Sequence, residues 1–334
     1  MPFSILALDF HNTIYDETLE YGLAIDAAVS ACLVAVPSVT REQIYAELAI
    51  ANRELGSDWD DDAWEILPSL KDQNKTLFEK ATATRHAKSK ELTLSGFYDG
   101  IDETLTALKL RGVRIYVVTE AAADAGMRAI EWLGLNGIVD GVYSYPSRKA
   151  PAVLKGTYHK PFMPNTTGHL RKPHPFLLAA VVLDEAIRRG EVPADTQISE
   201  LFEIKQDEAL LIAELPKEAP VQQDITARLV LKETSYSTAL KRILGHILYV
   251  GDSKFRDGML ARNAGVAFGY AAYGKKGHDS EAVRKSLDIM YATTGWDKEI
   301  MKLTQEAGRS ETVSRLQPDF TFENSLSEAL GLFI

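Results

Sequence analysis

The alternation of strand-like and helix-like segments constrains the fold of this chain more than any other feature. Apolar runs typical of strands occupy residues 113–119, 138–144, 246–252 and 266–274. Amphipathic helical patterns lie before, between or after these runs, over residues 102–112, 123–134, 175–190 and 256–265. Residues 3–9 (FSILALD) have the apolar density of a strand that is covered on both faces. Together these segments predict an α/β fold with a doubly wound parallel sheet.

Three further regions depart from this alternation. Residues 20–95 follow helical periodicity, and Thr40 and Gln43 stand in the spacing of a helix capping box. The helix over 175–190 and the strand over 246–252 are joined by more chain than a short connection needs. We therefore expect insertions with structure of their own near residues 190–245 and 275–317, the latter helical by its pattern.

Composition excludes several classes of protein. The 334 residues are 46% hydrophobic and 25% charged, with a net charge of −10, as expected of an ordered globular protein. A negative balance disfavours nucleic acid or an anionic membrane as the main partner. Cys32 is the single cysteine, which excludes an intrachain disulfide and a thiolate metal cage. The N-terminus has no secretion pattern, so we expect a cytoplasmic location.

Polar residues follow or end the predicted strands. Asp9 ends the strand over 3–9, Thr119 ends the strand over 113–119, and Asp252 ends the strand over 246–252. Ligands of open α/β sheets bind beyond the carboxyl ends of the strands. Lys172 precedes a helix that begins near Pro173 and Pro175, which favours it over Lys160, the other lysine before a proline.

These residue types suit phosphoryl transfer. Two neighbouring carboxylates need a cation between them, and hard oxygen ligands favour Mg²⁺. A carboxylate held ionised beside Mg²⁺ and a lysine can attack phosphorus and form an aspartyl-phosphate. Thr119 could donate a hydrogen bond to a phosphoryl oxygen, and the metal and Lys172 would stabilise the charge that develops in the transition state.

Four segments in this order resemble the signature motifs of the haloacid dehalogenase-like (HAD) hydrolase superfamily: LALDFHNT, IYVVT, RKPHPF and LYVGDSKFRD. The resemblance implies that Asp9 is the nucleophile, that Thr119 and Lys172 bind phosphate, and that Asp252 binds Mg²⁺ with Asp257 in support. It also implies a catalytic core of residues 1–15 and 96–334 and a helical cap of residues 16–95. Many relatives have Asn where this chain has Glu120, in a loop that faces the substrate.

The first motif departs from the family pattern at His11. Similar phosphatases carry a second Asp here, which acts as general acid and base, while the metal takes only the backbone carbonyl. We expect His11 to perform these proton transfers, because an unperturbed imidazole titrates near neutral pH. The alternative is that His11 only orients phosphate or packs, which would leave a slow or inactive enzyme.

The sequence therefore predicts Mg²⁺-dependent hydrolysis of a small phosphorylated metabolite. One rival is carbon–phosphorus or carbon–halogen cleavage in the same fold; the former would need a Schiff-base lysine, for which the candidates are Lys71, Lys75, Lys80, Lys88 and Lys90. The other rival is a catalytically weak member that serves as a binding or regulatory module. The acidic run at 57–65 is interpreted as a solvated helix start, and His86, His159, His169 and His174 show no ligand spacing.

Overall fold

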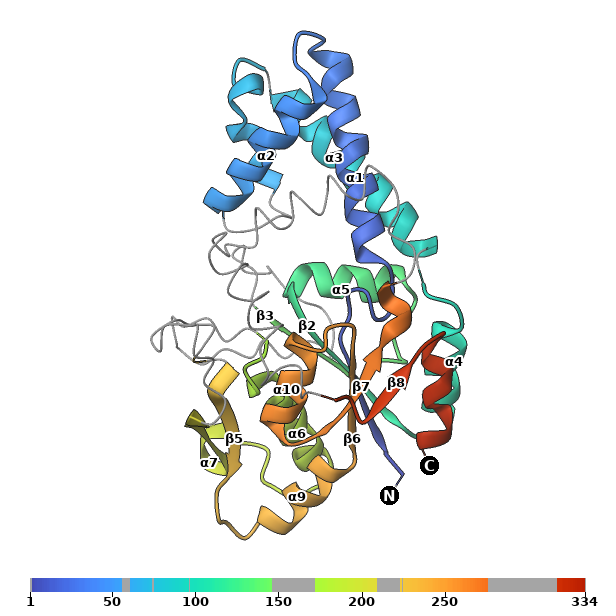
Figure 1. Ribbon diagram of the computed structural model, residues 1–334, viewed down its shortest axis with the longest axis vertical. Helices are drawn as coiled ribbons and strands as arrows, with labels where there is room; N and C mark the ends of the chain where they lie inside the picture. The colour runs from blue at the N-terminus through green and yellow to red at the C-terminus, as the bar shows by residue number, and fades with distance from the viewer. Residues whose placement is uncertain are drawn as a thin grey trace. The chain divides into compact units, whose positions relative to one another are not determined.

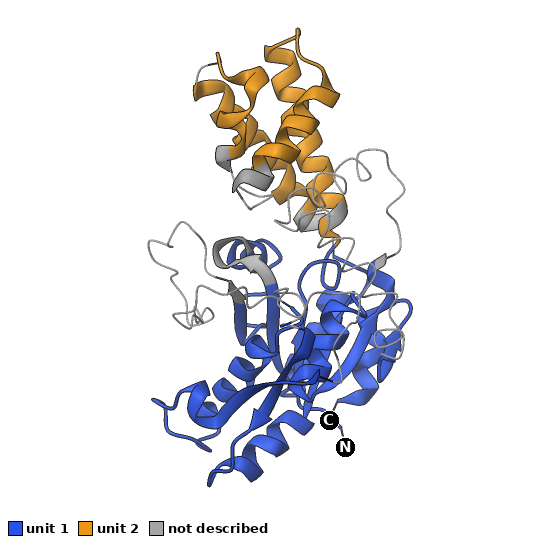
Figure 2. Ribbon diagram, turned by 60° about the vertical axis from the view of Figure 1, so that its left-hand side comes forward, with its two compact units in different colours: residues 1–15, 97–275, 306–334 blue, residues 16–96, 276–305 orange. Residues whose placement is uncertain are grey.

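The computed structural model describes residues 2–55, 61–73, 75–95, 97–145, 172–208, 223, 225–275 and 317–333. These residues form two compact units, drawn in blue and orange in Figure 2. Unit 1 takes the described residues within 1–15, 97–275 and 306–334, and unit 2 takes those within 16–96. Each unit has a hydrophobic core of its own.

Unit 1 is built on a six-stranded sheet (Figure 1). Its strands are β1 (Ile5–Leu8), β2 (Arg114–Ala122), β3 (Gly141–Tyr145), β6 (Ile247–Gly251), β7 (Ala267–Ala271) and β8 (Phe320–Phe322). They pair in the order β3-β2-β1-β6-β7-β8, and every pair is parallel. The predicted α/β parallel sheet is confirmed. Because the chain leaves β1 for one side of the sheet and later returns to its other side at β6, the strand order switches at β1.

Helices cover both faces of this sheet. In β1, Ile5 and Ala7 belong to one core cluster, and Leu6 and Leu8 belong to the other, as the two-residue period of a strand requires. The first cluster packs against α6 (Phe176–Arg188), α9 (Ser237–Gly245) and α10 (Arg256–Ala264). The second packs against α4 (Ile101–Leu110), α5 (Ala123–Trp132) and η5 (Leu326–Leu332). The segment over 318–330 contains β8, which is followed by the 3-10 helix η5.

The insertion near 190–245 carries structure of its own. Its described part contains α7 (Ile198–Leu201), the strands β4 (Phe202–Gln206) and β5 (Ala227–Leu231), and α9. β4 and β5 form a separate two-stranded antiparallel sheet, with Lys205 directly opposite Arg228. The second predicted insertion, at 275–317, falls almost wholly outside the described residues.

The elements that the structure describes in unit 2 are all helices, and the described residues between them are short turns and links. It contains α1 (Glu17–Ala35), α2 (Arg41–Leu55), α3 (Lys75–Ser95) and the short 3-10 helices η1 (Asp61–Ile66) and η2 (Pro68–Leu70). The hydroxyl of Thr40 accepts a hydrogen bond from the Gln43 amide at 3.2 Å, so the predicted cap at the start of α2 is present. Trp64 of η1 is fully buried in a core that α1, α2 and α3 share.

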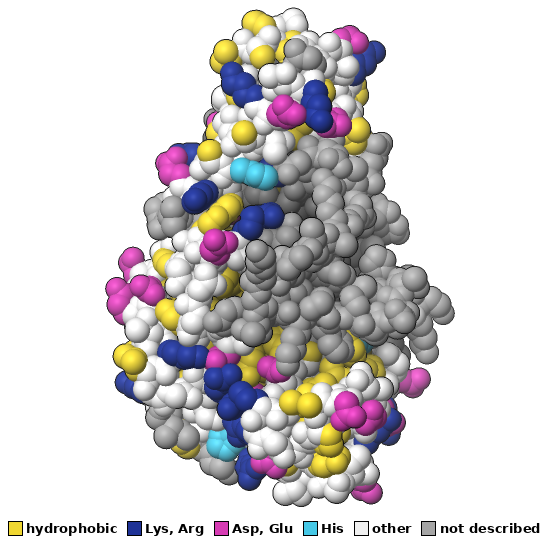
Figure 3. All heavy atoms as spheres, turned by 180° about the vertical axis from the view of Figure 1, so that it is seen from behind, with side chains coloured by type: hydrophobic (Ala, Val, Ile, Leu, Met, Phe, Trp, Pro, Cys, Tyr) yellow, Lys and Arg dark blue, Asp and Glu magenta, His cyan; other side chains and the backbone are white. Residues whose placement is uncertain are grey.

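The described surface is mixed in character. On the face drawn in Figure 3, Lys and Arg side chains are interspersed with Asp and Glu side chains. Among the described residues, none of the helices combines the length and the apolar character that a membrane span requires.

Candidate active site

Two carboxylates come together where the strand order switches. Asp9 directly follows β1 and Asp252 directly follows β6. These strands are parallel neighbours, with Leu8 opposite Val250, and the Asp9 amide donates to the Val250 carbonyl at 2.8 Å. The carboxyl ends of parallel neighbours meet at one edge of the sheet, which is where open α/β proteins bind ligands.

Lys172 reaches the same edge from a different part of the chain, the segment before α6. It lies four residues before α6 and is 3% exposed. Its ammonium group donates to the Asp9 carboxylate and to Oδ1 of Asp257, the latter at 2.9 Å. Asp257 is in the first turn of α10. The structure thus brings together Asp9, Lys172 and Asp257 from separate elements; Lys160, the less favoured lysine, lies outside the described residues.

The Asp257 carboxylate is held on both oxygens. Besides Lys172, Oδ1 accepts a hydrogen bond from the Tyr249 hydroxyl at 2.7 Å, and Oδ2 accepts one from the Ser253 amide at 3.0 Å. A Cβ atom at Gly251 would collide with this carboxylate, so the strand must end in glycine for Asp257 to occupy its place. The sequence analysis missed Tyr249, because a tyrosine in a buried strand has the pattern of a core residue.

The edge offers a set of candidate metal ligands. One oxygen from each of Asp9, Asp252 and Asp257 lies within 4.8 Å of the other two, and these are the one such group among the residues that the structure describes. Lys172 is held between two of these three carboxylates, which leaves negative charge for a cation to balance. Carboxylate oxygens are the donors that Mg²⁺ prefers, so the residues present fit this ion.

The combined effects of burial and charge shift the pKa values of Asp9 and Asp257 in opposite directions. Burial raises the pKa of Asp9 to about 6, with Asp257 adding to the rise and Lys172 opposing it. Burial alone would also raise the pKa of Asp257, but the charge and hydrogen bond of Lys172 and the Tyr249 hydroxyl hold it below its usual value. The two carboxylates outweigh desolvation at Lys172 and raise its pKa, so the lysine is charged.

His11 lies in a tight loop after β1. Its ring contacts Tyr15 edge to face, with ring centroids 5.7 Å apart. Burial, followed by the charges of Lys172 and Arg256, lowers the pKa of His11 to about 3, so this imidazole is neutral at pH 7. The next residue, Asn12, has a φ of 55°, and a Cβ atom at Gly274 would collide with its carbonyl oxygen. Gly274 is therefore needed for the loop to take this path.

Thr119 and Glu120 both lie within β2. Thr119 is fully buried. The expected end of the strand at Thr119 is wrong: β2 continues to Ala122, and its pairing with β3 shifts register between Val118 and Ala122. The residues that extend the strand, 120–122, are Glu and Ala, which are poor strand formers, so the sequence gives no signal of the extension. The side chain of Glu120 lies outside those described, so its predicted contact with substrate stays a prediction.

Arg256 is a second cation at the site that the sequence analysis missed. It is the residue before Asp257, and its charge lowers the pKa values of Asp9, His11 and Asp257. Of the acidic run at 57–65, the side chain of Glu65, in η1, is described and takes part in no group with metal-ligand geometry, and the other acidic side chains of the run lie outside those described. His174 is buried, which lowers its pKa to about 4, and its Nδ1 accepts from the Phe176 amide at 3.4 Å.

Comparison with known proteins gives matches of structure only. No protein-family model and no curated protein matches the chain. Among solved structures, the chain is similar to a Bacillus subtilis protein described as a HAD-hydrolase bound to magnesium, at 12% identity over 99% of both chains with a TM-score of 0.44. It is also similar to a Clostridium difficile protein described as a phosphatase, at 12% identity over 100% of both chains with a TM-score of 0.44.

A third match is a HAD-superfamily hydrolase of subfamily IA from Geobacter sulfurreducens. Its identity is 17% over 80% of this chain and 88% of the other, with a TM-score of 0.37. By their descriptions, two of these three proteins are HAD-superfamily hydrolases and one is a phosphatase.

Proposed function

We propose that this protein is a Mg²⁺-dependent hydrolase of a small phosphorylated metabolite, with Asp9 as the nucleophile. The observation that carries the proposal is the buried cluster of Asp9, Lys172 and Asp257 beside Asp252, at the carboxyl edge of the sheet. A lysine shared by two carboxylates keeps a charged donor beside the attacking group. Phosphoryl transfer depends mainly on such positioning and charge stabilisation.

Asp9 and Asp252 would hold the metal, because the oxygens of Asp257 already bind Lys172, Tyr249 and the Ser253 amide. When bound, Mg²⁺ supplies positive charge that keeps Asp9 ionised and draws electrons from the phosphoryl group. Asp9 attacks phosphorus, the bond from phosphorus to the ester oxygen breaks, and an aspartyl-phosphate forms. Lys172 and the buried Thr119 would bind phosphoryl oxygens during this step.

His11 would act mainly in the second step. His11 would accept a proton from the water that attacks the aspartyl-phosphate, and Asp9 would leave as a carboxylate; the pKa of about 3 makes His11 a weak base without ligand, contrary to the near-neutral value expected from the sequence, so the step relies on the charge of the phosphate to raise it. The same proton is then available to the next leaving alkoxide, because the negative charge of a bound phosphate ester favours the imidazolium form. Unit 2 (residues 16–96) would supply the cap that selects the substrate.

Hydrolysis of an aryl phosphate tests the proposal. We expect turnover with Mg²⁺ that stops with a chelator and falls by roughly 10³-fold or more in Asp9→Asn, by comparison with other nucleophile substitutions. Asp102→Asn, an exposed acid in the first turn of α4, is the matched control and should keep full activity. Full activity with chelator, or in Asp9→Asn, would overturn the proposal.

A second substitution tests the role of His11. If His11 transfers the protons, His11→Asp gains little activity and His11→Ala loses roughly 10²-fold or more. A large gain in His11→Asp would instead identify the native site as a weakened one, in favour of a binding or regulatory role. Trapping of a lysine adduct with borohydride would support carbon–phosphorus cleavage.

A further inference from the structure

A hollow lies in unit 1, and its lining contains none of the residues of the candidate active site. It has a volume of about 380 Å³ and is lined by the end of β4, by β5 and by the last turn of α10. Figure 1 shows β5 beside α10, and these two elements are in contact. None of the lining residues is Asp9, His11, Lys172, Asp252 or Asp257. The hollow is therefore a separate place in the fold.

Its charged lining is mainly basic. Three cations, Lys205, Arg228 and Arg262, and one carboxylate, Asp207, line the hollow of a chain whose net charge is −10. Lys205 and Arg228 are directly opposite in the β4–β5 ladder, and like charges in that position repel. Glu203 contacts Lys205 at 2.5 Å, but both side chains are exposed, so this pair contributes little. A bound anion would relieve the repulsion.

The wall of the hollow is already ordered. The Arg228 guanidinium donates to Asp207 at 3.1 Å and to the backbone carbonyl of Arg262 at 2.8 Å. An arginine held in this way loses little conformational entropy when it binds an oxyanion. Asn263, 1% exposed, lines the hollow and is held by donating to the carbonyl of Ile225 at 3.1 Å. Arg228 thus gives the hollow a fixed donor, whereas Asn263 uses its amide hydrogens on the carbonyls of Ile225 and Pro173 and fixes the wall.

Asn263 also joins the hollow to the active-site cluster. Its side-chain amide donates to the carbonyl of Pro173 at 3.2 Å, and Pro173 directly follows Lys172. The helix that carries Asn263, α10, begins with the turn that holds Asp257. A shift of Asn263 would thus reach Lys172 through one side-chain hydrogen bond and Asp257 through one helix.

From this juxtaposition we infer that the hollow is an effector site for a small metabolite that bears phosphate or carboxylate groups. Binding of its oxyanion to Lys205, Arg228 and Arg262 changes turnover at Asp9 through Asn263 and Pro173. The binding half of the inference is independent of the proposed function, whereas the effect on turnover rests on it.

Calorimetric titration of the metal-free protein with pyrophosphate, and separately with citrate, tests binding. Because the active site can bind anions too, the titration compares Arg262→Glu and Lys205→Glu with Lys172→Met, which removes the active-site cation. We expect Lys172→Met to keep one binding event that each glutamate variant weakens by roughly tenfold or more. The exposed Lys241→Glu, on α9, is the matched control and should bind as the native protein does.

Which probe binds distinguishes the source of the oxyanion, a phosphate or a carboxylate ligand. Loss of all binding in Lys172→Met, with unchanged binding in Arg262→Glu and Lys205→Glu, would overturn the inference.

The coupling between the hollow and the active site is tested by aryl phosphate turnover at a fixed concentration of free Mg²⁺. Pyrophosphate or citrate, whichever binds, should change the rate in the native protein and not in Arg262→Glu or Asn263→Ala; an equal change in all three proteins would disprove the coupling. Because binding is measured without turnover, an inactive protein would contradict the proposed function alone.

Discussion

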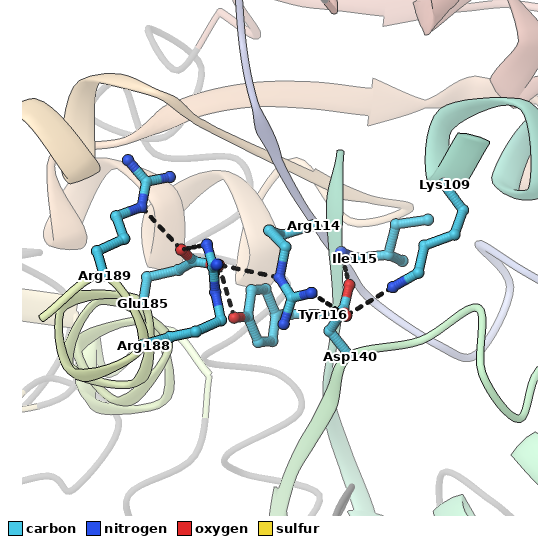
Figure 4. A network of polar contacts seen from close by, with 8 residues as sticks. All are labelled: Lys109, Arg114, Ile115, Tyr116, Asp140, Glu185, Arg188 and Arg189. Carbon is cyan, nitrogen blue, oxygen red and sulfur yellow. Dashed lines mark hydrogen bonds and ion pairs between the residues drawn. The ribbon is translucent and has the colours of Figure 1, made fainter. Parts of the chain in front are cut away.

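Unit 1 contains two buried clusters of charge at opposite ends of the same sheet. At the carboxyl edge, Lys172 is held by Asp9 and Asp257. At the amino edge, Arg114 begins β2 and Asp140 immediately precedes β3. Figure 4 shows this second network, in which two carboxylates, Asp140 and Glu185, are surrounded by Lys109, Arg114, Arg188, Arg189 and Tyr116.

The two clusters differ in their balance of charge. Glu185 is fully buried, yet hydrogen bonds from Arg188, Tyr116 and Arg189 overcome burial and lower its pKa. At the carboxyl edge, burial prevails and raises the pKa of Asp9 to about 6. The amino-edge carboxylates are therefore satisfied by the protein itself, whereas the carboxyl edge is short of positive charge. This shortage distinguishes a site that can bind a cation from an ion network that ties α6 to β2 and β3.

The largest expected effect is at Lys172. Lys172→Met should lower aryl phosphate turnover by roughly 10²–10³-fold, as loss of one charge-stabilising donor does. It should also destabilise the metal-free protein by about 3–5 kcal/mol, because buried carboxylates lose their cation. Mg²⁺ should restore part of that stability, since it binds the same carboxylates. Urea unfolding with and without Mg²⁺ measures this, with the exposed Lys241→Met as control.

Failure of Mg²⁺ to stabilise Lys172→Met more than the native protein would break the comparison. It would indicate that the carboxyl edge, like the amino edge, is complete without a metal.

Glu185→Gln is the corresponding change at the amino edge. It removes the counter-charge of three partly exposed arginines and weakens their hydrogen bonds, so it should destabilise the protein by about 1.5–3 kcal/mol, in urea unfolding with or without Mg²⁺. Turnover of the folded protein should be unchanged. Glu191→Gln is the matched control, because Glu191 pairs with the half-exposed Arg242 and should contribute no more than about 1 kcal/mol. A loss of turnover in Glu185→Gln at full folding would contradict a purely structural role.

The contributions of Asp9, at the carboxyl edge, and of Glu185, at the amino edge, to the free energy of unfolding should change with pH in opposite directions. The raised pKa of Asp9 favours its protonated form in the folded state, so its contribution is full below pH about 4 and is lost as pH rises through about 6. The lowered pKa of Glu185 acts in reverse: its contribution is present above its ordinary pKa of 4.5 and is lost as pH falls below it. Metal-free unfolding curves of Asp9→Asn and Glu185→Gln should each lack one of these trends.

The same pH range should govern metal binding. Mg²⁺ requires the ionised form of Asp9, so its affinity should rise between pH 5 and pH 7. Calorimetric titration with Mg²⁺ across this range measures the change. An affinity that is constant over these pH values would exclude Asp9 as the titrating ligand.

The sequence predicted the carboxyl edge far better than the amino edge. Asp9 and Asp252 each end an apolar run, so their positions follow from the pattern of the sheet. Arg114, Asp140 and Glu185 have no such signal, because charged residues at strand starts and on helices are normally solvated. Their burial depends on how α6 packs on β2 and β3, which is a property of the tertiary structure. Tyr249 was missed because a tyrosine in an apolar, buried strand has the pattern of a core residue, and nothing in the sequence indicates that its hydroxyl donates to Asp257.

The smallest expected effect is at the two tyrosines that donate to these clusters. Tyr249 donates to Asp257 at 2.7 Å and Tyr116 donates to Glu185 at 2.8 Å, and both tyrosines are fully buried. Tyr249→Phe and Tyr116→Phe each remove one hydrogen bond to a charged group, so each should cost about 1.5–3 kcal/mol of unfolding free energy.

Only Tyr249→Phe should also affect catalysis. Without the hydroxyl, Asp257 keeps Lys172 and the Ser253 amide but loses the donor that fixes Oδ1, so Lys172 is held less firmly beside Asp9. We expect kcat to fall roughly three- to tenfold with little change in KM, because the loss affects the transition state more than the bound substrate. Tyr116→Phe, with an equal loss of stability, should keep its kcat, since Glu185 lies at the other end of the sheet. Equal values of kcat in the two variants would show that the hydroxyl of Tyr249, like that of Tyr116, serves the fold alone.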